Sequence, residues 1–193
     1  MNATPTKDRW TGLDAILESG WRAWADAART PGHPFRTPVV ATAGDDGDAR
    51  VVVLRAVDRD AAELEFHTDA RSPKVEALRR SPRLTWVFHD PAGGVQWRVR
   101  GHARLHVGDE AWRSAWERVP PPSRASYACP AAPGTVVRAP MEAIDFAGHG
   151  PRHFMVVRCH AERMDWLGLR PEGNLRAIWT REGNSWKGDW VAP

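Results

Sequence analysis

The sequence predicts a mainly β domain, a barrel or sandwich with a few helices around it. Runs rich in valine, threonine and alanine follow one another at short spacing, and Gly/Asp or Gly/Asn turn signals separate them. No glycine-rich phosphate motif follows a strand, which argues against a doubly wound sheet. The 193 residues fit one domain, 1–193, because no internal repeat or long linker divides the chain.

The first predicted element is an amphipathic helix over about residues 11–29. Its apolar residues, from Leu13 to Ala28, recur at gaps of three and four and so share one helical face. Thr11 stands where a cap belongs, and Thr30-Pro31-Gly32 ends the pattern.

The rest of the chain reads as strands joined by turns and two short helices. Strands are predicted at 37–43, 50–57, 63–68, 83–88, 95–106, 153–163, 175–180 and 185–191. The first two flank a Gly/Asp turn at 44–48 and so predict a hairpin. Helices are predicted at 72–80, with Ser72 as cap and Pro73 in the first turn, and at 110–118. Residues 123–140 are rich in proline and predict a long connection.

Composition excludes several classes of function. The formal charge is +3 and no basic run appears, which is not typical of nucleic-acid binding. The first eight residues lack the apolar stretch of a signal peptide, and no segment has the apolar length to span a membrane, so a cytoplasmic location is expected. Neither the cysteines, Cys129 and Cys159, nor the histidines show metal-ligand spacing, so no metal site is expected.

Three segments carry more polar chemistry than a barrel core needs. Residues 50–55 form a strand with an arginine at each end, and residues 96–101 alternate polar and apolar side chains. Residues 66–74 end a strand and begin a helix, where hydroxyls, Lys74 and the free N–H groups of the helix start would together suit a phosphate. Taken singly, each segment is more often a solvated strand or a simple helix cap.

Taken in order, these segments resemble the pyridoxamine 5′-phosphate oxidase family. Residues 50–55 (Arg-Val-Val-Val-Leu-Arg) are similar to its Arg-x-Val-Leu-Leu-Lys strand. Residues 66–74 (Phe-His-Thr-Asp-Ala-Arg-Ser-Pro-Lys) look like its Phe-Tyr-Thr-Asn-x-x-Ser-Arg-Lys segment, and residues 96–101 resemble its Gln-Val-Arg-Val-x-Gly. Trp166 and Arg176 keep the ten-residue separation of its flavin-contacting tryptophan and arginine, and residues 186–193 look like its C-terminal ending.

The resemblance implies an FMN-binding split barrel of Greek-key type, working as a homodimer with FMN at the interface. It also implies a role for each matching position. The residues expected to hold the phosphate and ribityl chain are Arg50, Thr68, Ser72 and Lys74. Val51, Val52 and Arg55 would line the flavin ring, with His67 at the family's tyrosine position, and Gln96 would bond the ring edge. Trp166 and Arg176 would approach the flavin from the second subunit. No catalytic acid or base is identified.

The sequence departs from the family pattern at the substrate site. Glu172-Gly173-Asn174 stands where the family has Arg-Leu-His, and a carboxylate in place of arginine reverses the Coulomb interaction with a substrate phosphate. Pro73 replaces a second basic residue of the cofactor site. The sequence therefore predicts an FMN-dependent oxidoreductase acting on another small molecule. Two alternatives stay open: a true pyridoxamine 5′-phosphate oxidase that uses other cations, such as Arg124 or Arg170, and a non-enzymatic flavin-binding protein.

Overall fold

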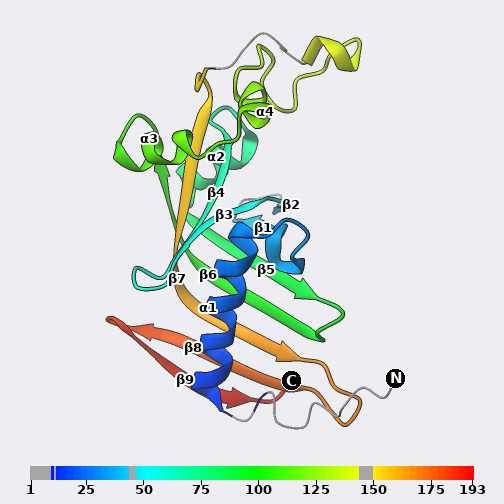
Figure 1. Ribbon diagram of the computed structural model, residues 1–193, viewed down its shortest axis with the longest axis vertical. Coiled ribbons are helices and arrows are strands. Elements are labelled where there is room, and N and C mark those ends of the chain that lie inside the picture. The colour runs from blue at the N-terminus through cyan, green and yellow to red at the C-terminus, as the bar shows by residue number, and fades with distance from the viewer. Residues whose placement is uncertain (1–9, 11, 44–46, 144–149) are drawn as a thin grey trace.

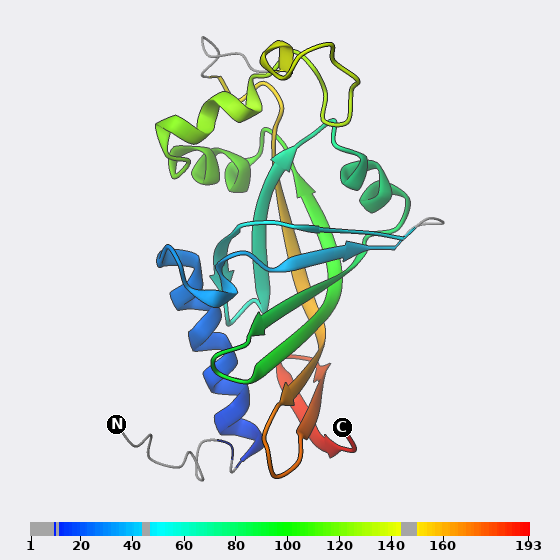
Figure 2. The same ribbon diagram turned by 90° about the vertical axis from the view of Figure 1, so that its right-hand side faces the viewer.

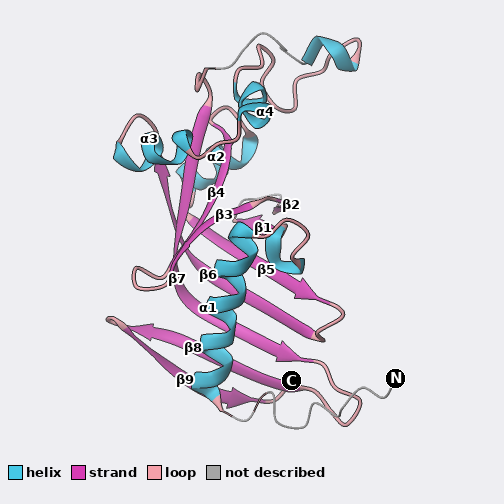
Figure 3. Cartoon of the chain, viewed as in Figure 1, coloured by secondary structure: helices cyan, strands magenta, loops and turns pink. Residues whose placement is uncertain are grey.

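The structure, a computed structural model, describes Trp10 and residues 12–43, 47–143 and 150–193. Within these residues, one nine-stranded antiparallel sheet curls into a half-barrel, and helix α1 lies across its open side (Figures 1 and 3). Helices α3 and α4 gather at one end of the molecule, and the β8–β9 hairpin forms the other (Figure 2). The predicted mainly β barrel with peripheral helices is confirmed.

The element bounds follow the predicted order closely. The helices are α1 (Leu13–Arg29), α2 (Pro73–Arg80), α3 (Glu110–Glu117) and α4 (Pro121–Arg124), with 3-10 turns η1 (Pro34–Arg36), η2 (Ala125–Tyr127) and η3 (Pro140–Ala143). The strands are β1 (Val39–Thr42), β2 (Asp48–Val51), β3 (Leu54–Asp58), β4 (Glu63–Asp69), β5 (Arg83–Asp90), β6 (Val95–His106), β7 (Phe154–Gly168), β8 (Leu175–Glu182) and β9 (Ser185–Val191).

Strand β7 divides the sheet. Its first half pairs with β4 and its second half with β8, while β6 pairs along its other edge for almost the whole length. The strand order is therefore β2-β1-β5-β6-β7-β4-β3, with the β8–β9 hairpin branching from β7. Gly101 lies at the bulge between β6 and β7, where an added Cβ would lie 1.9 Å from a backbone oxygen, so this close approach of two strands requires glycine.

Tryptophan rings fill the space between α1 and the sheet. Trp24 is fully buried and contacts Trp97 edge-on, with ring centroids 5.2 Å apart. Trp86 stacks on Phe88 in the same core. The predicted helix is confirmed, with Gly12 at its N-cap; Thr11, the predicted cap, lies outside the described residues, as do residues 44–46 of the first hairpin turn.

Two sequence predictions need correction. The expected single strand 50–57 is two strands, because the backbone N–H of Val52 donates to the carbonyl of Pro38 and the chain then crosses from its pairing with β1 to its pairing with β4. Ser72 is the N-cap residue of α2, as predicted, but its side chain makes no cap hydrogen bond. Its hydroxyl is used by a lysine instead.

A second, smaller core lies on the outer face of β4 and β7. There α3 and the η2 turn pack Trp112, Trp116 and Tyr127 around Phe154. Among the described residues, no helix has both the length and the apolar character needed to cross a bilayer.

Candidate functional site

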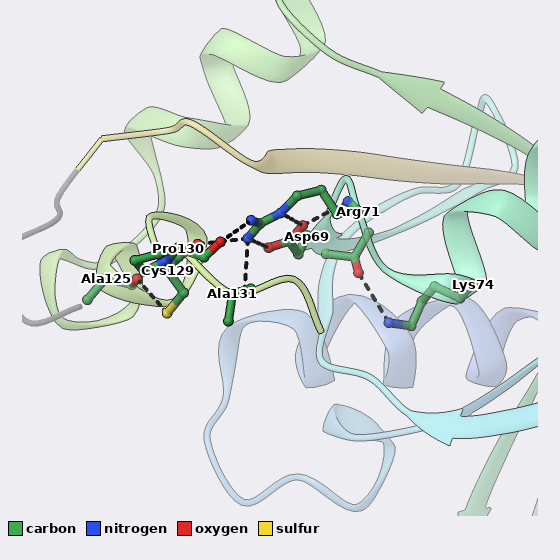
Figure 4. A network of polar contacts seen from close by, with 8 residues as sticks. Asp69, Arg71, Lys74, Ala125, Cys129, Pro130 and Ala131 are labelled. Carbon is green, nitrogen blue, oxygen red and sulfur yellow. Dashed lines mark hydrogen bonds and ion pairs between the residues drawn. The ribbon is translucent and has the colours of Figure 1, made fainter. Parts of the chain in front are cut away.

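Four of the predicted cofactor residues come together where β4 leads into α2. The Lys74 ammonium donates to the hydroxyls of Ser72 (2.6 Å) and Thr68 (3.3 Å). Figure 4 shows Lys74 directed back across the turn. Arg50, from β2, donates to the hydroxyl of Thr42 (3.0 Å), and its charge acts on Lys74. We call Arg50, Thr68, Ser72 and Lys74 the cradle.

The cradle places two cations side by side among hydroxyls. Burial and the neighbouring guanidinium of Arg50 both lower the pKa of Lys74. Pro73 has no backbone N–H, and the N–H of Val75 donates to the carbonyl of Ser72, so the helix end offers few free amides and the side chains would make most of the contacts to a ligand here. An anion between Lys74 and Arg50 would relieve their repulsion. A phosphate therefore fits these residues.

Arg71 fixes the turn that carries the cradle. Its guanidinium donates to the carboxylate of Asp69 at 2.8 Å and to the carbonyls of Cys129 and Pro130 at 2.8 Å each (Figure 4). Asp69 also accepts from the backbone N–H of Arg71 (2.8 Å). This contact ties the cradle turn to the proline-rich connection. Sequence reasoning missed it, because three of the acceptors, the carbonyls of Cys129, Pro130 and Ala131, are backbone groups that no motif encodes.

His67 points to the opposite side of β4 from Thr68. Its Nε2 lies 3.0 Å from a carboxylate oxygen of Glu65, whose other oxygen accepts from Arg158 (2.8 Å). Burial lowers the pKa of His67. Burial alone would raise the pKa of Glu65, but hydrogen bonds from His67 and Arg158 outweigh it and lower that pKa. The pair is thus a neutral imidazole beside a carboxylate.

Residues 50–55 do not form a single surface. Arg50 belongs to the cradle, Val51 is 62% exposed, and Val52 is 9% exposed within the core. Arg55 lies near His67 and Tyr127: its charge adds to the lowering of the His67 pKa by burial, and it opposes the rise that burial causes in the pKa of Tyr127. Its buried Nε has no partner among the described residues. The crossover between β2 and β3 separates these side chains.

Gln96 and Arg176 share a row on the outer face of the sheet. Gln96 is paired with Leu167, which is paired in turn with Arg176. Arg176 holds both carboxylate oxygens of Asp165, at 3.1 and 2.8 Å. Burial would raise the pKa of Asp165, but its bonds to Arg176 and the charge of Arg98 outweigh it and lower that pKa.

Trp166 faces away from this row. Its indole is 1% exposed and packs edge-on against Trp10, with ring centroids 5.1 Å apart. The structure thus brings together the cradle residues, and separately Gln96 with Arg176, while the ring of Trp166 is enclosed by its own chain.

Comparison with known proteins agrees with the family resemblance that the sequence motifs predict. Residues 19–107 match the family model described as "Pyridoxamine 5′-phosphate oxidase, FMN-binding domain". A pyridoxine/pyridoxamine 5′-phosphate oxidase 2 from Arabidopsis thaliana is 26% identical over 155 residues, covering 70% of this chain and 75% of that protein.

Solved structures share the whole fold. A pyridoxamine 5′-phosphate oxidase-related, FMN binding protein from Nostoc punctiforme has a TM-score of 0.78 at 21% identity, covering 92% of this chain and 97% of that one. PhzG from Burkholderia lata, in complex with tetrahydrophenazine-1-carboxylic acid, has a TM-score of 0.72 at 23% identity, covering 100% of this chain and 98% of that one. The predicted split-barrel fold and the predicted resemblance are confirmed.

Proposed function

We propose that this chain, as a member of the pyridoxamine 5′-phosphate oxidase-like family of split barrels, binds FMN and acts as an FMN-dependent oxidoreductase on a small molecule. The observation that carries the proposal is the cradle. Lys74 and the hydroxyls of Thr68 and Ser72 converge at one turn beside Arg50, which also pairs with Asp48. Burial and the charge of Arg50 lower the pKa of Lys74, and Asp48 and Asp69 only partly offset them. When bound, FMN supplies hydride-transfer chemistry.

The chain's own residues would bind and orient the cofactor. Lys74 and Arg50 hold its phosphate, and the Arg71–Asp69 contact keeps the turn between them rigid. The Gln96 amide both donates and accepts, which suits the edge of a heterocycle. Arg176, oriented by Asp165, places a fixed positive charge on the same face.

A homodimer is part of the proposal. The cradle lies beside α2, whereas Gln96 and Arg176 lie on the outer sheet face, in the part of β6 and β7 that continues into β8. A second copy packed over this face would bring its own Arg176 to the cofactor held by the first. The substrate differs from pyridoxamine 5′-phosphate, because Glu172 stands where the family has arginine and would repel a phosphate.

The first experiment is a visible absorption spectrum of the purified protein, followed by FMN titration of the colourless form. Bound FMN in the wild type, and weakened binding in an Arg50→Gln/Lys74→Gln variant, are expected. Lys187→Gln, at an exposed position of β9, is the control. Equal FMN affinity in the double variant would refute the cradle assignment.

Two further measurements test the enzyme and the dimer. A panel of small-molecule donors, mixed anaerobically with the FMN-loaded protein, should include at least one that bleaches the flavin absorbance. If every donor leaves it oxidised, a flavin carrier replaces the oxidoreductase. Light scattering coupled to size-exclusion chromatography should give twice the monomer mass.

A further inference from the structure

Four arginines surround a single carboxylate on the outer face of the sheet. Arg98 and Arg100 come from β6, Arg163 from β7 and Arg176 from β8, and together with Asp165 they line a hollow of about 170 Å³. We call this the arginine hollow. Since one carboxylate faces four guanidinium groups, the hollow keeps a marked excess of positive charge.

The excess is concentrated at one cross-strand pair. Arg100 on β6 stands directly opposite Arg163 on β7, and among the described residues neither has an ion-pair partner. Like charges placed directly opposite on paired strands destabilise a sheet. The next pair on the same face shows the stabilising arrangement, because there Arg98 stands opposite Asp165 and bonds to it.

The one carboxylate is already used. Asp165 accepts from Arg176 through both oxygens and from Arg98 as well, and its side chain is only 14% exposed. These bonds orient two of the four guanidinium groups, whereas the exposed side chains of Arg100 and Arg163 have no carboxylate partner among the described residues of one chain. Planar guanidinium groups bind carboxylates and phosphates through paired N–H bonds, which fixes the position of such an anion.

We propose that the arginine hollow binds the anionic group of a small molecule, a carboxylate or a phosphate. Its volume suits one such group rather than a whole ligand. A second hollow of about 260 Å³ adjoins it, shares Arg100, and is lined also by Thr42, Thr85 and Glu162. The body of the ligand would lie there.

Thr42 lines the second hollow and also accepts from Arg50, but the register places Thr42 and Arg50 on the face opposite Arg100. The hollow is therefore separate from the cradle within one chain, and only a second copy packed over the outer face, as in the proposed dimer, would bring a cofactor to it. The assignment of the anion to the substrate rests on the proposed function, and it makes the substrate an acidic small molecule. The anion site itself does not depend on flavin.

Inorganic phosphate is the probe. The Lys74→Gln protein, in which the cradle is impaired, is melted with increasing phosphate at constant ionic strength set by sodium chloride. Phosphate should raise the melting temperature, and adding Arg100→Gln and Arg163→Gln should weaken phosphate binding at least tenfold. The same two changes should leave the melting temperature without phosphate equal or slightly higher, because they remove a repulsion that solvent and salt already screen. Arg104→Gln, an exposed arginine of β6 outside the hollow, should leave the phosphate response unchanged.

Either of two results would overturn the proposal. One is a phosphate response that survives both substitutions. The other is a missing phosphate response in the Lys74→Gln protein; a dimer that also weakens in the Arg100→Gln/Arg163→Gln protein would then make the hollow a subunit contact. If phosphate binds the hollow as expected but FMN does not bind the wild type, the anion site stands and the oxidoreductase assignment falls.

Discussion

Removing the guanidinium of Arg71 should loosen the connection that follows α3 and weaken the cradle turn. An Arg71→Met substitution keeps the length of the side chain but deletes its bonds to Asp69, Cys129 and Pro130. Breaking a buried ion pair costs about 3–5 kcal/mol. Arg71 is 26% exposed, and Asp69 keeps one backbone N–H, so we expect a smaller loss of about 2 kcal/mol.

Two assays measure this loss. A loss of about 2 kcal/mol corresponds to roughly 30-fold more frequent local opening, which hydrogen exchange of peptides spanning residues 120–131 would report. If the connection unfolds with the domain, the melting temperature should fall by about 4–8 °C. Arg79→Met, on the exposed side of α2, is the matched control. Hydrogen exchange and a melting temperature equal to those of the control would show that the Arg71 contacts do not hold the connection.

Three other features make separate predictions. Because burial lowers the pKa of folded His67 from 6.5, the unfolded chain binds a proton that the folded one does not, and stability should fall as the pH drops below about 6.5. In His67→Gln, whose amide can still donate to Glu65, urea midpoints between pH 7 and 5 should change less; an unaltered slope would count against the assignment. Burial raises the pKa of the Cys159 thiol to about 12. Only the Cys129 thiol should therefore react with a disulfide reagent in the native protein, and Cys159 should react after unfolding. Two thiols that react fast in the native protein would contradict this. Gly101→Ala should lower the free energy of unfolding by about 1–3 kcal/mol in a denaturant titration. Gly150→Ala, whose added Cβ would meet open space, should not lower it. Equal stability of the two variants would show that the bulge can shift.

The cradle could be predicted because most of it is local. Thr68, Ser72 and Lys74 lie within one strand-turn-helix segment, so their spacing already brings their side chains to one turn. Arg50 joins them through the pairing of β2 with β1. The crossover after Val51 could not be predicted, because a continuous valine-rich run contains no residue that marks the change of pairing partner.

The directions of single side chains were harder to predict. His67 and Thr68 are neighbours on β4 and therefore face opposite sides, one toward the smaller core and one into the cradle. Trp166 and Arg176 keep the family's spacing, yet the indole points into the barrel and the guanidinium outward. Spacing fixes neither direction, since the register between β7 and β8 decides which face each residue takes.

Like charges are placed close together at two separate sites of the sheet. The charge of Arg50 acts on Lys74 in the cradle, although Arg50 also pairs with Asp48, and Arg100 stands opposite Arg163 in the arginine hollow. Selection for stability alone would favour opposite charges at such positions, as the sheet has at Arg98 and Asp165. Departures of this kind are expected where a sheet serves a ligand, and both departures here would be relieved by negative charge. A phosphate in the cradle and an acidic group in the arginine hollow would supply it.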